Sequence, residues 1–146
     1  MSRTEKGASL IELTLMTGVI AIVLAFAGAG FVAAASRYQG KAAAAELAAE
    51  LRAARYLAIM RRERVRMVFE PAQGRVRTER ADEPKELIRQ YVYGERNIVL
   101  ERLSNGPSII FYPSGRAATA TTIMLRNGQQ ERWQITVSLT GRISIL

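Results

Sequence analysis

A long run without charged side chains near the N-terminus constrains this chain more than any other feature. From residue 13 to residue 36 there is no Asp, Glu, Lys or Arg. An α-helix rises about 1.5 Å per residue, so a helix over this run reaches roughly 36 Å and can cross the hydrocarbon core of a bilayer. The sequence therefore predicts one membrane-spanning helix.

A single carboxylate, Glu12, stands at the start of this run. An ionised carboxylate in hydrocarbon costs roughly 2.5 to 3.5 kcal/mol on insertion scales, so we expect Glu12 to have a partner or a function. A terminal amine of an adjacent subunit offsets part of the desolvation cost when the two charges approach closely. The alternative is that Glu12 lies at the headgroup level of an ordinary signal anchor and pairs with nothing.

The flanks of the run bear on its fate and orientation. Its apolar stretch is too long for a secretory signal peptide, so we expect the span to be retained. Arg3 and Lys6 against Glu5 give the first seven residues a charge of +1, which favours a cytoplasmic N-terminus. The remainder of the chain is then expected outside the cytoplasm.

Composition limits what the remainder can do. About 110 residues follow the span, which suits one small domain. The chain has no cysteine and no histidine, so disulfides are excluded and the commonest metal ligand and general base are missing. No nucleophile and base stand at the spacing of a known motif, so we expect neither an enzyme nor a bound cofactor or metal.

After residue 36 small and apolar residues recur at three- and four-residue spacing, as on one face of an amphipathic helix. We expect a continuous helix from about Ser9 to Arg61, apolar all round in its first half and packed on a sheet in its second. Gly40 is a position where this helix could bend. The stripe consists of Ala44, Leu47, Ala48, Leu51, Ala54 and Ala58.

Beyond Arg61 the period changes from 3.6 to 2, which indicates strands. A hairpin is expected over 65–80 with its turn at 71–74, and further strands over 87–93, 98–103, 108–112, 121–126, 132–138 and 143–146. Asn105-Gly106 and Asn127-Gly128 are both strong hairpin signals. The predicted class is α+β, with one antiparallel sheet or two packed sheets covered on one face by the helix.

The N-terminal residues Lys6-Gly7 and Leu10-Ile11-Glu12-Leu13 resemble the class III signal of type IV pilins and pseudopilins. The resemblance implies that a prepilin peptidase cuts between Gly7 and Ala8 on the cytoplasmic face and methylates the new amine of Ala8. Glu12 is then the fifth mature residue, where that family has a glutamate. The first mature residue is usually phenylalanine in the family, and this chain has Ala8 instead.

Further segments resemble the GspH/FimT family, namely 109–116 (IIFYPSGR), 123–127, 133–138 and 140–143. The resemblance implies a pilin-like fold and a structural subunit of a type II secretion pseudopilus; the alternative is a type IV minor pilin. It divides the chain into a leader (1–7), a transmembrane assembly helix (8–36) and a periplasmic globular domain (37–146), anchored in a bacterial inner membrane. The implied partners are other pseudopilins or pilins, the prepilin peptidase, an inner-membrane assembly platform and membrane lipid.

The net charge of +8 suggests a rival ligand, extracellular DNA. Guanidinium groups hold phosphates well, and the candidates near the first hairpin are Arg61, Arg62, Arg64 and Arg66. Some FimT-like proteins bind DNA through a Gly-Arg-x-Arg motif, which is matched here by Gly141-Arg142-Ile143-Ser144 with Ser144 in place of the second arginine. We favour the alternative, in which these arginines form a solvated face or pair with acidic neighbours in a filament.

Overall fold

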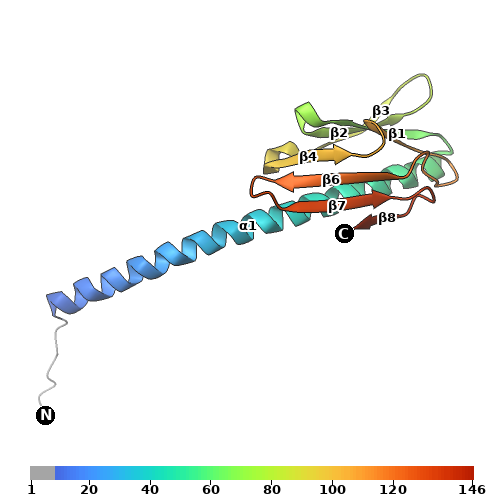
Figure 1. Cartoon of the computed structure of the whole chain (residues 1–146). Coiled ribbons are helices and arrows are strands. Elements are labelled where there is room, and N and C mark those ends of the chain that lie inside the picture. Colours follow the sequence, from blue (N-terminus) through green and yellow to red (C-terminus); the bar gives the residue numbers. More distant parts are fainter. Residues whose placement is uncertain (1–8) are drawn as a thin grey trace, which may run out of the picture. The chain divides into compact units, whose positions relative to one another are not determined.

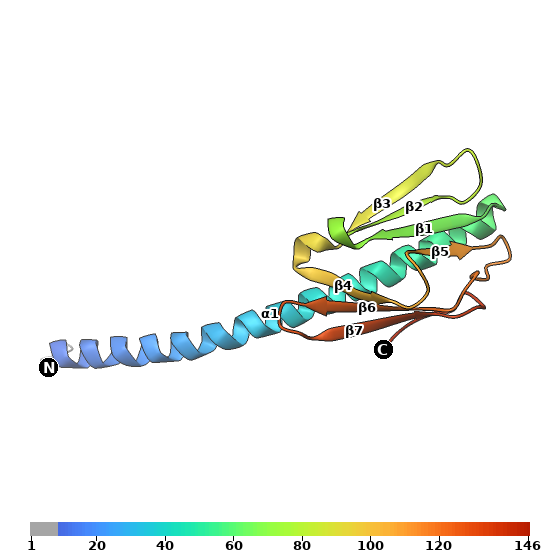
Figure 2. The ribbon, with the colours of Figure 1, turned by 45° about the horizontal axis from the view of Figure 1, so that its top comes forward.

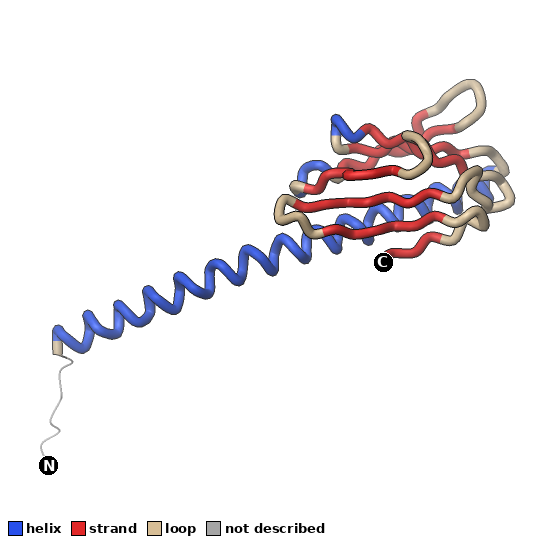
Figure 3. The backbone as a smooth tube through the Cα atoms, viewed as in Figure 1, coloured by secondary structure: helices blue, strands red, loops and turns tan. Residues whose placement is uncertain are grey.

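The computed structural model describes residues 9–146, which form one long helix followed by eight strands (Figures 1 and 3). The helix α1 spans Leu10–Arg61, as the sequence predicted. The strands are β1 (Val65–Glu70), β2 (Arg75–Arg80), β3 (Leu87–Val92), β4 (Ile98–Leu103), β5 (Ser108–Phe111), β6 (Thr121–Asn127), β7 (Arg132–Val137) and β8 (Ile143–Ile145). Two 3-10 turns, η1 (Pro71–Gln73) and η2 (Gly94–Arg96), connect β1 to β2 and β3 to β4.

The chain divides into two compact units, one ending at Ala35 and the other running from Ser36 to Leu146. In the first unit, α1 is long and apolar enough to cross a membrane, and its most apolar window is not buried by the rest of the chain. The second unit holds the remainder of α1 and all the strands of the described residues.

The C-terminal half of α1 supplies the centre of the core of the second unit. All six residues of the predicted stripe are 0–1% exposed and belong to one cluster with side chains from both sheets. Alanine at four of these positions lets the strands approach the helix axis closely, and Leu47 and Leu51 fill the remaining space. The helix ends where Arg62 adopts a φ of 55°, the left-handed conformation that commonly terminates helices.

The strands form two four-stranded antiparallel sheets, in the orders β3-β2-β1-β5 and β4-β6-β7-β8 (Figures 1 and 2). Alternate residues of β1 and of β6 are buried, as expected for strands with one face on the core. The hairpin of β1 and β2 pairs Val65 with Arg80 and Glu70 with Arg75, around the predicted turn. The two-sheet form of the α+β prediction is therefore the one observed.

The hairpin predicted at Asn105-Gly106 is wrong. β4 before it pairs with β6, and β5 after it pairs with β1, so this turn carries the chain from one sheet to the other. A two-residue type I′ turn needs a positive φ at both central residues, and here Gly106 has one and Asn105 does not. Pro107 contributes no N–H to a ladder, and its carbonyl accepts the Phe69 N–H at 2.8 Å instead, which draws the chain toward β1.

The second predicted hairpin is confirmed, because β6 and β7 pair from Thr121 with Val137 to Arg126 with Arg132. Its loop is longer than the Asn-Gly signal implied. The Asn127 N–H donates to the Glu131 carbonyl at 3.1 Å, and the residue with positive φ is Gln130. Asn127 and Glu131 therefore follow directly on the last pair of the β6–β7 ladder, which is Arg126 with Arg132.

Gly40 has a packing role that the sequence did not reveal. α1 is continuous through it, and Gly40 itself is buried. A Cβ at this position would lie 2.0 Å from Cη2 of Trp133 on β7, far inside van der Waals contact. The missing side chain thus makes room for the indole ring against the helix backbone, which is a reason for glycine other than bending.

Candidate assembly site

The first turns of α1 expose an apolar surface that holds one charged group, Glu12 in the first helical turn. Ser9 begins the helix, since its carbonyl accepts the N–H groups of Glu12 (2.9 Å) and Leu13 (3.1 Å). The Thr14 and Thr17 hydroxyls donate to carbonyls of the preceding turn, which satisfies them without a partner helix. Within residues 9–146 the Glu12 carboxylate makes no hydrogen bond or ion pair, so any partner of Glu12 lies outside this segment.

Large apolar side chains surround Glu12 along this part of α1 and are more than half exposed. In water such a surface is unfavourable at about 25 cal/mol per Å², so it requires lipid or other helices. The surface is formed by Leu10, Ile11, Leu13, Leu15, Met16, Val19, Ile20, Ile22, Val23 and Leu24. The predicted cleavage pair Gly7 and Ala8 lies outside the described residues, so cleavage and methylation there stay predictions.

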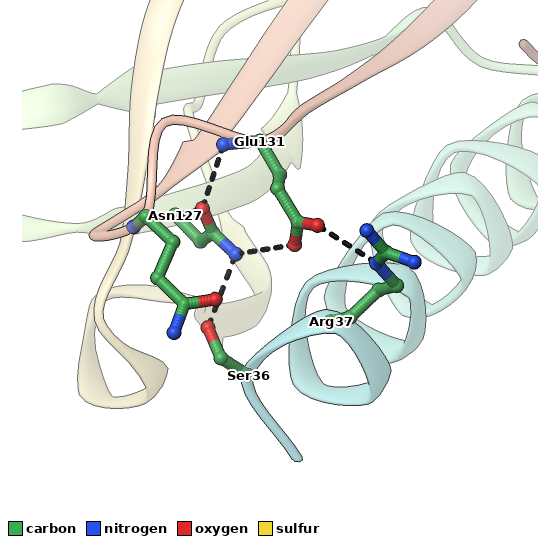
Figure 4. A network of polar contacts seen from close by, with 5 residues as sticks. Ser36, Arg37, Asn127 and Glu131 are labelled. Atoms are coloured by element: carbon green, nitrogen blue, oxygen red, sulfur yellow. Dashed lines mark hydrogen bonds and ion pairs between the residues drawn. The ribbon is translucent and has the colours of Figure 1, made fainter. Parts of the chain in front are cut away.

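A polar cluster fastens the start of the globular unit to α1 (Figure 4). Asn127 is 4% exposed, and its side-chain amide donates to Ser36 Oγ (3.1 Å) and to Glu131 Oε2 (3.0 Å). Its Oδ1 accepts the backbone N–H groups of Gln129 (3.1 Å) and Glu131 (2.9 Å). Arg37 Nε donates to Glu131 Oε1 at 2.7 Å. The β6–β7 loop thereby holds the helix at the point where it enters the unit.

Sequence reasoning missed this cluster. Asn127 was identified only as a turn residue, and Ser36 only as the end of the apolar run. The two residues are separated by 91 positions. Because no local pattern relates residues so distant, only the tertiary structure brings them together.

Arg37 and Asn127 lower the pKa of the Glu131 carboxyl, mainly through the hydrogen bond from Arg37, and partial burial opposes them. A lowered pKa in the folded state stabilises the fold above the ordinary carboxyl pKa of 4.5, and this contribution is lost as the pH falls below it. We expect Glu131→Gln to lower the unfolding midpoint temperature slightly at pH 6, with the difference from the native chain shrinking toward pH 3. Thermal unfolding across this range measures it.

The matched control for this prediction is Glu95→Gln, since Glu95 is exposed and forms no ion pair within residues 9–146. It should leave the pH dependence of the midpoint unchanged. A difference between Glu131→Gln and the native chain that stays constant from pH 6 to pH 3 would contradict the role assigned to the carboxylate.

The arginines predicted near the first hairpin fall into two groups. Arg64 forms a two-pronged ion pair with Asp82, which raises the pKa of Arg64 and lowers that of Asp82 through their hydrogen bond and charge. Arg66 Nε lies 3.6 Å from Glu79 Oε1, and Arg66 Nη2 donates to the Ala81 carbonyl at 3.2 Å. Arg61 and Arg62 are exposed and form no ion pair within residues 9–146. Among the described residues, Arg64 and Arg66 are therefore paired, and the guanidinium groups of Arg61 and Arg62 are free of ion pairs.

Gly115 and Gly141, which belong to two of the segments that resemble the GspH/FimT family, both contact Arg55 of α1. Arg55 Nε donates to the Gly115 carbonyl at 2.8 Å. Gly141 packs on this hydrogen bond so closely that a Cβ added to Gly141 would lie 2.0 Å from the Gly115 oxygen and 2.7 Å from Arg55 Nε. Both glycines have φ of +77°. Arg142 follows Gly141, is exposed, and makes no ion pair within the described part of the chain.

Comparison with protein families decides the affiliation of the chain. The family model described as "Type II transport protein GspH" matches residues 43–141, more than half of the sequence. The chain belongs to the GspH family. The match covers the C-terminal part of α1, the strands β1 to β7 and the two glycines Gly115 and Gly141, so it confirms the GspH/FimT resemblance noted in the sequence.

Solved structures share the fold of this GspH-family chain. The minor pseudopilin EpsH from the type 2 secretion system of Vibrio cholerae superimposes with a TM-score of 0.63 at 19% identity, covering 74% of this chain and 96% of that one. The type IV minor pilin FimU of Pseudomonas aeruginosa gives a TM-score of 0.65 at 16% identity, covering 75% and 90%. A sequence search of curated proteins finds no significant match. The pilin-like fold is thereby confirmed.

Proposed function

We propose that this protein is a minor pseudopilin of a type II secretion system, a structural subunit of the filament that helps to move folded proteins across the outer membrane. The GspH family match supports secretion over the pilus. The exposed apolar surface of α1, with Glu12 as its charged group, supports assembly through this helix. We place the subunit in the bacterial inner membrane, with the globular unit in the periplasm.

The assembly step follows from the apolar surface. When α1 leaves the bilayer, it exchanges lipid contacts for contacts with similar helices, so its apolar side chains stay out of water throughout. The Glu12 carboxylate then meets the free amine of a neighbouring subunit, which offsets the cost of burying both charges. A subunit shifted along the filament leaves both charges unpaired, so the pair sets the register.

The second candidate is a type IV minor pilin, and the similarity to FimU favours it as strongly in fold as EpsH favours secretion. In-frame deletion of the gene in its host separates the two roles. Loss of secreted proteins from the medium, with pili unchanged, supports the pseudopilin. Loss of surface pili or of DNA uptake, with secretion unchanged, supports the minor pilin and overturns our choice.

Complementation of the deletion with Glu12→Leu tests the assembly mechanism. We expect normal insertion into the membrane but at least about a tenfold loss of co-purification with other filament subunits, because the buried amine of the neighbour loses its counter-charge. Affinity purification and assays of secreted protein measure the two effects.

Thr14→Ala is the matched control, since the Thr14 hydroxyl bonds only to its own helix among the described residues. It should assemble like the native chain. Full secretion and co-assembly by Glu12→Leu would show that this carboxylate does not set the register.

A further inference from the structure

Positive charge collects where α1 ends, beside two carboxylates, Glu63 and Asp82, that pair with Arg80 and Arg64. Three segments contribute: the last turns of α1 (52–62), the loop after β5 (112–120) and the loop before β8 (138–142). Together they contain six arginines and no Asp or Glu, in a chain whose net charge is +8. The six are Arg52, Arg55, Arg61, Arg62, Arg116 and Arg142.

Hydrogen bonds and close packing bring the three segments together at one end of the globular unit (Figure 2). Arg55 on α1 holds the Gly115 carbonyl at 2.8 Å, and the Ala117 N–H donates to the Leu139 carbonyl at 3.1 Å. Gly141 packs directly on Gly115. Since Arg116 and Arg142 immediately follow these two glycines, their side chains start from adjacent backbone.

We call Arg52, Arg116 and Arg142 the arginine face. Arg52 lies one helical turn before Arg55 on α1. All three are exposed and form no ion pair within residues 9–146. Elsewhere the fold neutralises many of its arginines. Among the described residues, ion pairs are formed by Arg37, Arg64, Arg66, Arg75, Arg77, Arg80, Arg89 and Arg132.

Exposed apolar side chains come from the same segments. Tyr56 is 62% exposed, Met60 61% and Leu139 49%. Tyrosine, methionine and arginine are the residue types enriched at protein interfaces, and a central apolar patch with a charged rim is the usual interface anatomy. A phosphate backbone gains nothing from Met60 and Leu139, so this composition favours a protein partner over a nucleic acid.

The charge also restricts which protein can bind. Two copies of this chain meeting through this surface would place arginine against arginine, and like charges across an interface repel. We propose that the arginine face binds an acidic surface of a different pilin-like subunit in the same filament. This proposal rests on the proposed function as a filament subunit, and holds for a pseudopilus and for a pilus.

The test uses the purified full-length mature chain in detergent and, as probes, the other minor pilin-like proteins encoded beside it in the host genome. We expect one acidic probe to bind, with affinity that falls between about 50 mM and about 300 mM salt. The double variant Arg116→Glu/Arg142→Glu should bind it at least about 30-fold more weakly, because attraction becomes repulsion. Reversal of acidic residues on the probe to lysine should restore binding to this variant.

Lys41→Glu/Arg102→Glu is the matched control, because it changes the net charge equally at two exposed residues outside the three segments. It should bind the probe like the native chain. Thermal unfolding checks whether each double variant is folded. The milder Arg116→Gln/Arg142→Gln replaces the reversal variant if that one unfolds.

Four results would overturn the proposal. The first two are that no probe binds the native chain, and that both double variants lose affinity equally. The others are that the native chain self-associates through the arginine face, and that the reversal variant loses binding to a DNA duplex but not to the probe. These failures are separate from failure of the proposed function. If deletion of the gene abolishes secretion while the reversal variant restores it fully, the arginine face has no such partner and the secretion role stands.

Discussion

Gly141→Ala is expected to destabilise the globular unit severely. Gly141 has a φ of +77°, where a residue with a side chain costs roughly 1 to 2 kcal/mol. Its new Cβ would also lie 2.0 Å from the backbone oxygen of Gly115, which cannot rotate away as a side chain can. Overpacking of this kind costs about 1 to 3 kcal/mol, so we expect a total of roughly 2 to 5 kcal/mol.

A loss of this size is a large part of the 5 to 15 kcal/mol that stabilises a typical domain. Denaturant titration of the native and variant chains measures it. Gly106→Ala is the matched control, because Gly106 has nearly the same φ, +75°, and nothing lies within 4 Å of the added Cβ. The difference between the two variants isolates the contact with Gly115, and equal losses would show that the contact is absent.

Gly7→Glu is expected to abolish maturation. If the prepilin peptidase recognises this glycine, the variant keeps its leader, and no free amine forms at Ala8 for the Glu12 of a neighbour. The retained charges of Arg3 and Lys6 also resist transfer through the bilayer, at roughly 2.5 to 3.5 kcal/mol each. Mass spectrometry of the membrane-bound chain should find a start within the leader, and secretion should fall to the level of the deletion strain.

Ser2→Glu controls for the added negative charge, because it alters the leader to the same extent without touching the proposed cleavage pair. It should be processed normally. A mature chain that begins at Ala8 in the Gly7→Glu variant would contradict the assigned cleavage site. An intact N-terminus in the native chain would contradict the prepilin interpretation as a whole.

Local patterns were sufficient for most of the secondary structure. The spacing of Ala44, Leu47 and Leu51 predicted the buried face of α1, since a helix repeats its faces every three or four residues regardless of what packs on them. Alternation of apolar residues in β1 predicted which face of that strand is buried, for the same kind of reason. The prediction at Asn105-Gly106 was wrong, because a turn signal does not say which strands will pair.

The candidate site was predictable only in part. The position of Glu12 at the start of an apolar run is read directly from the order of residues, and no tertiary contact was needed to identify it. Whether each arginine forms an ion pair was not predictable, because this depends on residues that approach from other parts of the chain. Arg64 is paired with Asp82 and Arg142 is not, and nothing in their immediate sequence neighbourhood distinguishes them.

The sequence by itself determined the apolar helix, its single carboxylate and the α+β class, because helix and strand periods and the cost of burying charge act over a few neighbouring residues. The tertiary structure alone decided that Asn127 reaches Ser36, that Trp133 packs on Gly40, and that Gly115 and Gly141 meet at Arg55. These contacts join residues far apart in the chain, and they depend on the distance between helix and sheets that the whole core sets.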